Sequence, residues 1–215
     1  MKKLLSWLVL SSLLAVSPGF AATAQDLGEG LSYFRLRALP ADLPSTPALK
    51  ACVLDLRYTP GDAPAAAALA AWLKFHAATR TPVFLLANSA TATALLHVLA
   101  GPALPAGTLT LGLPAPGFSP DIAIPTTAEV ESRAYAALTA GTPLAALVQE
   151  NAVKPRYDEA EMLRRKASGE PLESEDDDAP AATQPTQPAP PLVDATLQRA
   201  VQLHRGFAAL GLFKD

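Results

Sequence analysis

The chain has 215 residues, of which 50% are hydrophobic and 17% are charged, and its formal net charge is −3. This mild negative charge argues against nucleic acid or an anionic membrane as a partner. Cys52 is the single cysteine, so an intramolecular disulfide is excluded. Its place in an apolar strand pattern predicts a buried, inert thiol.

The first 24 residues have the pattern of a secretory signal peptide. Lys2 and Lys3 precede an apolar stretch, Leu4–Val16, and residues 22–24 (Ala-Thr-Ala) fit a cleavage site. The stretch is shorter than a membrane-spanning helix requires. We therefore expect an exported protein, periplasmic or extracellular, with no transmembrane span after the signal is cleaved.

Apolar runs alternate with helix-forming stretches over residues 25–153, which we expect to fold as one domain. The dense apolar runs are typical of buried parallel strands, and the Ala- and Leu-rich stretches are typical of helices. This order predicts an α/β fold with right-handed crossovers in a parallel-rich sheet. The expected elements are strand Gly30–Arg37, strand Ala48–Leu56, helix Ala63–Ala78, strand Pro82–Ala87, helix Ala90–Ala100 and strand Gly107–Leu113.

Capping signals mark the helix ends. Asp62 follows a Pro-Gly turn and can cap the first helix, whereas Pro114–Pro125 is expected to be a loop. Thr126 and Glu129 have the spacing of a capping box for a helix over residues 128–140. Gly141 can end that helix, and a short helix is expected over residues 142–151.

The C-terminal part of the chain changes composition twice. We expect a charged helix over residues 154–167, then an acidic, Pro-rich linker over residues 168–191 that cannot bury enough apolar surface to fold. A terminal helix within residues 192–215 carries an apolar side, so we expect it to dock back onto the domain. The side chains on that side are Leu197, Ala200, Val201, Leu203 and Phe207.

Apart from the turn over residues 88–93, few side chains suggest a catalytic or ligand-binding role. Asp55 and Arg57 alternate at a buried strand end, which favours a structural ion pair or a strand-end contact over a catalytic role. His76 and His204 are isolated on separate helices. No cluster of Cys, His and Asp has metal-ligand spacing, and no Gly-rich phosphate loop is present. We therefore expect neither a metal nor a cofactor.

Four segments, in the same order, resemble the catalytic domain of the tail-specific, C-terminal-processing serine peptidases (the S41 family). Residues 53–62 (VLDLRYTPGD) are similar to the family's VLDLRxNPGG, and residues 82–94 (PVFLLANSATATA) to PVxVLVNxxTASAS. Residues 117–122 (GFSPDI) resemble GIxPDI, and residues 194–201 (DATLQRAV) resemble DxxLxxAL. The resemblance implies a ClpP/crotonase-like fold, here without a PDZ domain.

The resemblance also implies a serine–lysine dyad, in which a buried lysine of low pKa activates the serine hydroxyl. Thr93 stands at the position of the nucleophilic serine. Phe118 stands at the position of the lysine, or else this segment is shortened, and no lysine lies between Lys74 and Lys154. The residue types therefore indicate that the dyad is lost.

The cleft residues implied by the resemblance are Gly61, Asp62, Asn88 and Ala94, at the oxyanion hole or beside it. Asp62 replaces the second glycine of the family's turn. His97 lies four residues after the nucleophile position, so both side chains can share one helix face, and it is an alternative base. The other interpretation of His97 is a histidine at the edge of a packed helix.

Three hypotheses follow for the function. The leading one is an exported S41-like protein without peptidase activity that binds unfolded peptide or protein segments or acts as a scaffold. The resemblance adds a possible homo-oligomer. The second is an active serine-type endopeptidase with Thr93 as nucleophile and an unrecognised base. The third is a structural envelope protein whose cleft is filled by core side chains, with Phe118 as an apolar plug.

Overall fold

A computed structural model describes residues 24–44, 50–101, 104–148, 167 and 191–212. The chain divides into two compact units. Unit 1 comprises Met1–Pro125 and Ala200–Asp215, and unit 2 comprises Thr126–Arg199. The expected signal peptide, charged helix and acidic linker lie almost entirely outside the described residues.

Unit 1 is built on a six-stranded sheet whose strands lie side by side in chain order. The first pair is antiparallel, and all other neighbouring strands are parallel. The α/β class with a parallel-rich sheet is therefore confirmed. The strands are β1 (Gln25–Asp26), β2 (Ser32–Arg35), β3 (Cys52–Asp55), β4 (Val83–Ala87), β5 (Thr108–Gly112) and β6 (Ile122–Ala123).

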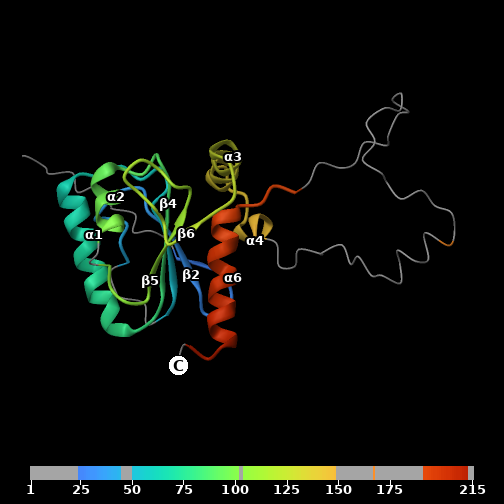
Figure 1. Cartoon of the computed structure of the whole chain (residues 1–215), viewed down its shortest axis with the longest axis horizontal. Coiled ribbons are helices and arrows are strands. Elements are labelled where there is room, and N and C mark those ends of the chain that lie inside the picture. Colours follow the sequence, from blue (N-terminus) through green and yellow to red (C-terminus); the bar gives the residue numbers. More distant parts are fainter. Residues whose placement is uncertain (1–23, 45–49, 102–103, 149–166, 168–190, 213–215) are drawn as a thin grey trace, which may run out of the picture. The chain divides into compact units, whose positions relative to one another are not determined.

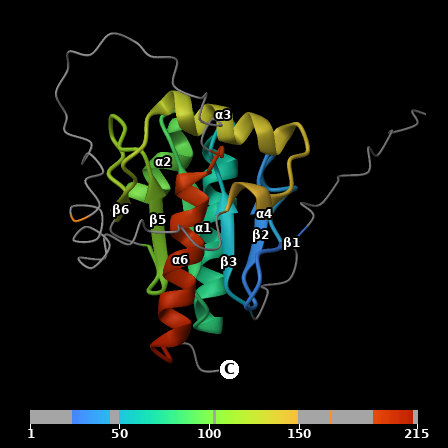
Figure 2. The ribbon, with the colours of Figure 1, turned by 90° about the vertical axis from the view of Figure 1, so that its right-hand side faces the viewer.

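Helices cover both faces of this sheet. Helices α1 (Ala63–His76) and α2 (Thr93–Ala100) lie on one face, and the part of α6 (Ala195–Ala209) that belongs to unit 1 lies on the other (Figure 1). Figure 2 shows the same layers from the side of α6. Side chains alternate between the faces, so Leu54 and Leu85 join the core with α1 and α2, whereas Phe84 faces α6. Burial on both faces explains the almost unbroken apolar runs of β3 and β4.

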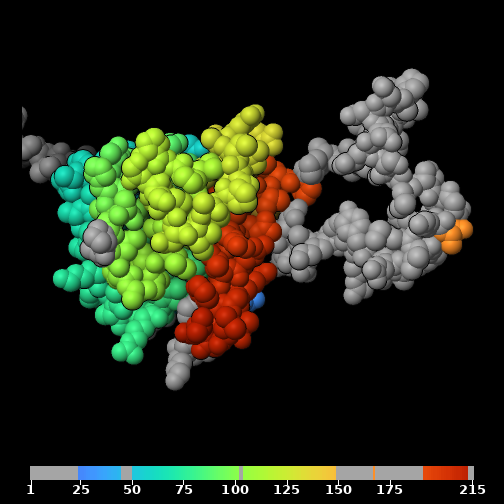
Figure 3. Space-filling model, viewed as in Figure 1, coloured from blue at the N-terminus to red at the C-terminus, as the bar shows by residue number. Residues whose placement is uncertain are grey.

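The second half of α6 packs on the sheet through small and aromatic side chains. Ala200 and Val201 are buried, and the Phe207 ring stacks on Phe84 with 6.3 Å between centroids. Of the side chains predicted to lie on the packing side, Leu203 is half-buried, and the neighbouring His204 is buried. In the space-filling view, this half of α6 and the β5–β6 region form a continuous surface (Figure 3).

Unit 2 contains α3 (Ala128–Thr139), α4 (Leu144–Leu147) and the first turn of α6. The predicted capping box at Thr126 and Glu129 is wrong. Thr127 is the N-cap of α3, and its hydroxyl accepts a hydrogen bond from the Val130 N–H at 3.3 Å. Gly141 follows the C-cap with a left-handed φ of 96°, as the capping signal predicted.

Several boundaries differ from the sequence-based expectation. The sequence does not predict β1 and β6, because two-residue strands carry no periodicity of their own and exist only through pairing with β2 and β5. Helix α1 ends at His76 and continues as a 3-10 turn, η1 (Ala77–Thr79). None of the helices in the described part of the chain has the length and apolar character that a membrane crossing requires.

Candidate functional site

The turns that follow β3 and β4 meet at the carboxyl edge of the sheet, where the predicted site residues lie. The Thr59 hydroxyl donates to the Leu36 carbonyl at 2.6 Å, and the Thr91 hydroxyl donates to the Leu56 carbonyl at 2.9 Å. Each hydroxyl thus caps a carbonyl just beyond the end of the preceding strand. The Ala92 N–H donates to the Thr59 carbonyl at 3.0 Å, which ties the two turns together.

Asn88 is buried and organises the turn after β4. Its N–H donates to Thr91 Oγ1 at 3.1 Å, and its carbonyl accepts from the Thr91 N–H at 3.0 Å. Its Oδ1 accepts from the Ala90 N–H, also at 3.0 Å. These bonds hold a non-helical turn, so α2 begins at Thr93 and not at Ala90 as expected. These contacts give Asn88 a structural role in the turn.

Thr93, the predicted nucleophile position, is the first residue of α2 and is exposed. Its hydroxyl forms no hydrogen bond within the part of the chain that the structure describes. His97 lies one helical turn further and is also exposed, but no hydrogen bond joins the two side chains among the described residues. Ala94 is half-buried against the core of unit 1. A hydroxyl needs an adjacent base to become a nucleophile, and the described residues place none here.

Phe118, the predicted lysine position, is buried in the core that α1 and α2 share with the sheet, with 3% of its surface exposed. It closes a tight turn with Ala115, in which each backbone N–H donates to the other residue's carbonyl, at 3.0 and 2.9 Å. Gly117 occupies this turn with a left-handed φ of 75°. An aromatic ring therefore fills the place that the resemblance gives to a base.

Gly61 and Asp62 have structural roles in the turn before α1. A Cβ at Gly61 would lie 3.0 Å from side-chain atoms of Leu95 on α2, so glycine permits close packing here. The Asp62 carboxylate accepts from the Ala65 N–H at 3.0 Å and caps α1, which confirms the capping prediction. The Asp62 carboxylate therefore stabilises the start of α1.

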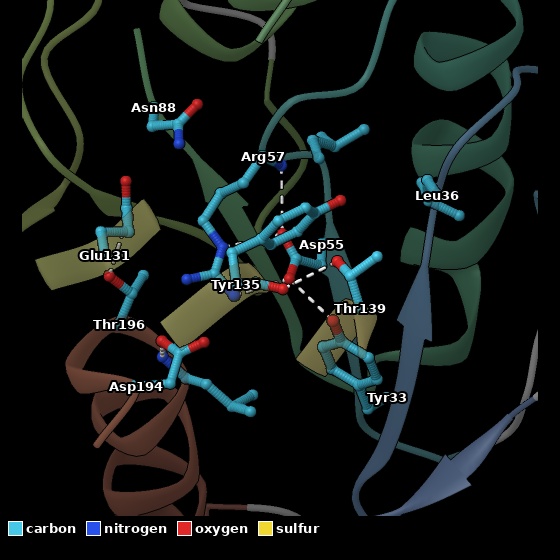
Figure 4. A network of polar contacts seen from close by, with 12 residues as sticks. Tyr33, Leu36, Asp55, Arg57, Asn88, Glu131, Tyr135, Thr139, Asp194 and Thr196 are labelled. Atoms are coloured by element: carbon cyan, nitrogen blue, oxygen red, sulfur yellow. Dashed lines mark hydrogen bonds and ion pairs between the residues drawn. The ribbon is translucent and has the colours of Figure 1, made fainter. Parts of the chain in front are cut away.

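A buried network of Tyr33, Asp55 and Arg57 lies at the carboxyl end of β3 (Figure 4). The Arg57 Nη2 donates to Asp55 Oδ2 at 2.7 Å and its Nε donates to Oδ1 at 2.9 Å, which confirms the predicted ion pair. The Arg57 backbone N–H adds a bond to Oδ1 at 3.1 Å, and the Tyr33 hydroxyl donates to Oδ2 at 2.7 Å. Both charged side chains are fully buried.

This network can be buried because both oxygens of the Asp55 carboxylate accept hydrogen bonds from Arg57 and Tyr33. Removing an ion pair from water costs several kcal/mol per ion, and the cost is offset only by close geometry and additional hydrogen bonds. Sequence reasoning missed Tyr33. The strand register carried the signal: Tyr33 pairs with Val53, so Tyr33 and Asp55 share one face of the sheet.

Unit 2 contains a polar contact of its own. Thr196 donates to Glu131 Oε1 at 3.2 Å, and both side chains are buried (Figure 4). The Asp194 carboxylate accepts from the Leu197 N–H at 3.0 Å and so caps α6. The Asp194 N–H donates to the Leu147 carbonyl of α4 at 2.9 Å. These bonds fix the start of α6 within unit 2.

The remaining reactive groups of the described residues do not form a further site. Cys52 is buried, as predicted, and desolvation raises the pKa of its thiol to about 12. His204 contacts the Glu29 carbonyl through Nε2 at 2.9 Å, and His76 lies on a different helix. Within the described residues, no group of three or more His, Cys, Asp or Glu side chains could hold a metal ion.

Comparisons with protein-family models and with curated proteins find no match for this chain. The functional interpretation therefore depends on the resemblance of the four segments and on the geometry of the carboxyl edge of the sheet.

Proposed function

We propose that this chain is an exported, S41-like protein of the ClpP/crotonase-like fold that has lost peptidase chemistry and acts as a scaffold that binds unfolded polypeptide segments. The observation that carries the proposal is the pair of replacements at the dyad. Thr93 presents an exposed hydroxyl without a base among the described residues, and Phe118 is buried in the core. The parallel-rich sheet is compatible with this fold.

Loss of the dyad removes hydrolysis but leaves a surface for binding. Ser89 and Thr93 present exposed hydroxyls at the carboxyl edge of β4, where they can hydrogen-bond to a bound chain. Thr59 and Thr91 are already engaged with strand carbonyls, so the turns behind this surface are rigid. A rigid polar edge can hold a peptide without stabilising a transition state, which is the requirement for binding without turnover.

The burial of Phe118 also favours a second candidate function, a purely structural envelope protein. In that case the cleft of the ancestral enzyme is occupied by core side chains and nothing binds at the edge. The two candidates differ in one measurable property, the affinity for an extended polypeptide.

The alternative of an active threonine peptidase requires a base that reaches Thr93 Oγ1. His97 is the nearest candidate by sequence, and its ring forms no hydrogen bond with Thr93 among the described residues. This hypothesis therefore has less structural support than the two others.

The test combines cleavage and binding of an unfolded protein, such as casein, by the purified chain and by a Thr93→Ala variant. We expect no cleavage by either protein, together with measurable binding of fluorescently labelled casein. Cleavage that disappears in the variant would refute the proposal and establish a peptidase. Absence of both cleavage and binding, with the fold intact by circular dichroism, would favour the structural role.

A further inference from the structure

His76 is the last residue of α1 and is almost fully buried, with 1% of its surface exposed. Its imidazole stacks on the indole of Trp72, one turn earlier in α1, with 4.8 Å between ring centroids and an angle of 18°. Its Nε2 lies 2.9 Å from the Thr81 hydroxyl, and its Nδ1 is buried with no hydrogen-bond partner among the described residues. A buried ring with one orphan nitrogen calls for a physical explanation.

The hydroxyls around His76 determine which nitrogen carries the proton. The Thr79 hydroxyl donates to the His76 carbonyl at 2.7 Å, so its single proton is used there. The contact between Thr79 Oγ1 and Thr81 Oγ1, at 2.7 Å, must then take its proton from Thr81. Thr81 Oγ1 can therefore only accept from His76, and the proton of the neutral imidazole is on Nε2.

Three hydrogen bonds form a closed ring, which we call the histidine latch: His76 Nε2–H to Thr81, Thr81 to Thr79, and Thr79 to the His76 carbonyl. The latch joins the end of α1 to Thr81, which lies two residues before the start of β4. In this state Nδ1 is a bare lone pair. A second proton could be added only at Nδ1, where the described residues provide no acceptor.

We propose that the histidine latch is a pH-sensitive device, closed while the His76 imidazole is neutral and opened when acid adds a proton to Nδ1. The proton comes from solvent, and the resulting N–H has no acceptor in its buried position. The imidazolium side chain must therefore leave the latch to reach water. This movement breaks the hydrogen bond between His76 and Thr81 and separates the imidazole from the Trp72 indole.

The partners of the imidazole among the described residues carry no charge that could compensate the added proton. Its stacking partner is the Trp72 ring of α1, and its hydrogen-bond partner is the Thr81 hydroxyl, which in turn contacts the Thr79 hydroxyl of η1. None of these groups titrates near neutral pH. Among the described residues, no carboxylate forms an ion pair or hydrogen bond with the ring.

The other titratable groups of these elements do not change this conclusion. Lys74 of α1 and Arg80 after η1 are cationic and exposed, and Cys52 on the neighbouring strand β3 stays neutral. Desolvation by burial lowers the pKa of His76, and this effect exceeds the opposing one of a hydrogen bond with the Thr81 backbone. The net lowering of the pKa agrees with the burial of the ring in the latch.

The effect on stability has a definite sign. The unfolded chain binds the proton near the ordinary pKa of roughly 6.5, whereas the folded chain resists it until the pH is lower. The contribution of the latch is therefore complete above roughly pH 6.5 and is lost as the pH falls from there through the lowered pKa of folded His76.

The test is the melting temperature of the full chain between about pH 7.5 and about pH 5, a range in which histidine titrates. His76→Gln retains an N–H donor for Thr81 but cannot titrate, and His97→Gln alters an exposed histidine as a matched control. We expect the acid-side fall in melting temperature to be smaller in His76→Gln and unchanged in His97→Gln. An equal fall in all three proteins would overturn the proposal.

A second measurement needs no substitution at His76. Nitrogen-15 NMR distinguishes the two neutral tautomers of each of the three histidines. We expect the His76 ring to be protonated on Nε2 at neutral pH, and we expect the nuclear Overhauser effects between this ring and Trp72 to disappear on acidification. A proton on Nδ1 at neutral pH would overturn the latch, even if the His76→Gln variant failed to fold.

Discussion

Replacing Thr91 by valine removes a buried hydroxyl that bonds in two directions, while the branched shape of the side chain is retained. The hydroxyl donates to the Leu56 carbonyl and accepts from the Asn88 N–H. The Leu56 carbonyl keeps a second donor, the Thr59 N–H at 3.0 Å, so only one hydrogen bond is lost there. The Asn88 N–H, by contrast, is left without this acceptor in a buried position.

The magnitude follows from these two terms. The hydrogen bond lost at the Leu56 carbonyl costs about 1 kcal/mol, and removing the Thr91 acceptor of the buried Asn88 N–H costs about 1–3 kcal/mol. Burial of the new methyl group returns about 0.8 kcal/mol. We therefore expect Thr91→Val to lower the free energy of unfolding by about 1–3 kcal/mol, a fall of several degrees in the melting temperature.

The matched control is Thr93→Val, two residues further, at the first residue of α2. Thr93 is exposed and forms no hydrogen bond within the described residues, so the change should stay within about 0.5 kcal/mol. Urea unfolding followed by circular dichroism measures both variants. Equal destabilisation by the two substitutions, or no effect of Thr91→Val, would refute the conclusion that the Thr91 hydroxyl stabilises the fold and the Thr93 hydroxyl does not.

Three further predictions test the sheet and its buried polar groups. Tyr33→Phe removes a 2.7 Å hydrogen bond to the buried Asp55 carboxylate and should cost about 1.5–3 kcal/mol in urea unfolding, whereas no loss would contradict the network. Gly112→Ala places a Cβ 1.9 Å from a backbone oxygen of β4, at a φ of 151°, so it should prevent folding or strongly destabilise the chain. The control is Gly117→Ala, where the Cβ meets nothing within 4 Å and only the left-handed φ costs about 1–2 kcal/mol. Cys52 should resist iodoacetamide at about pH 8 in the folded chain and react after denaturation, because the thiolate is the nucleophile and the pKa of the buried thiol is raised to about 12; rapid labelling of the native chain would show that the thiol is accessible.

Local patterns by themselves determined the class of fold and most of the elements. The apolar runs of β3 and β4 and the Ala-rich stretch of α1 carry their own propensity, and Asp62 predicts the start of its helix through its position in a Pro-Gly turn. These signals act within a few residues, so an inspection of the chain finds them. The buried ion pair of Asp55 and Arg57 was predictable for the same reason, since the two residues are neighbours on one strand end.

Only the tertiary structure decided which of the polar residues bond to one another. Thr91 and Thr93 belong to the same sequence pattern, yet one caps the Leu56 carbonyl 35 residues earlier in the chain and the other faces solvent. The strands β1 and β6 exist through pairing alone, and the burial of Phe118 depends on the helices that pack around it. Each of these features requires groups that are distant in sequence to meet. No local propensity encodes such a meeting, because its free energy comes from packing and from hydrogen bonds across the fold.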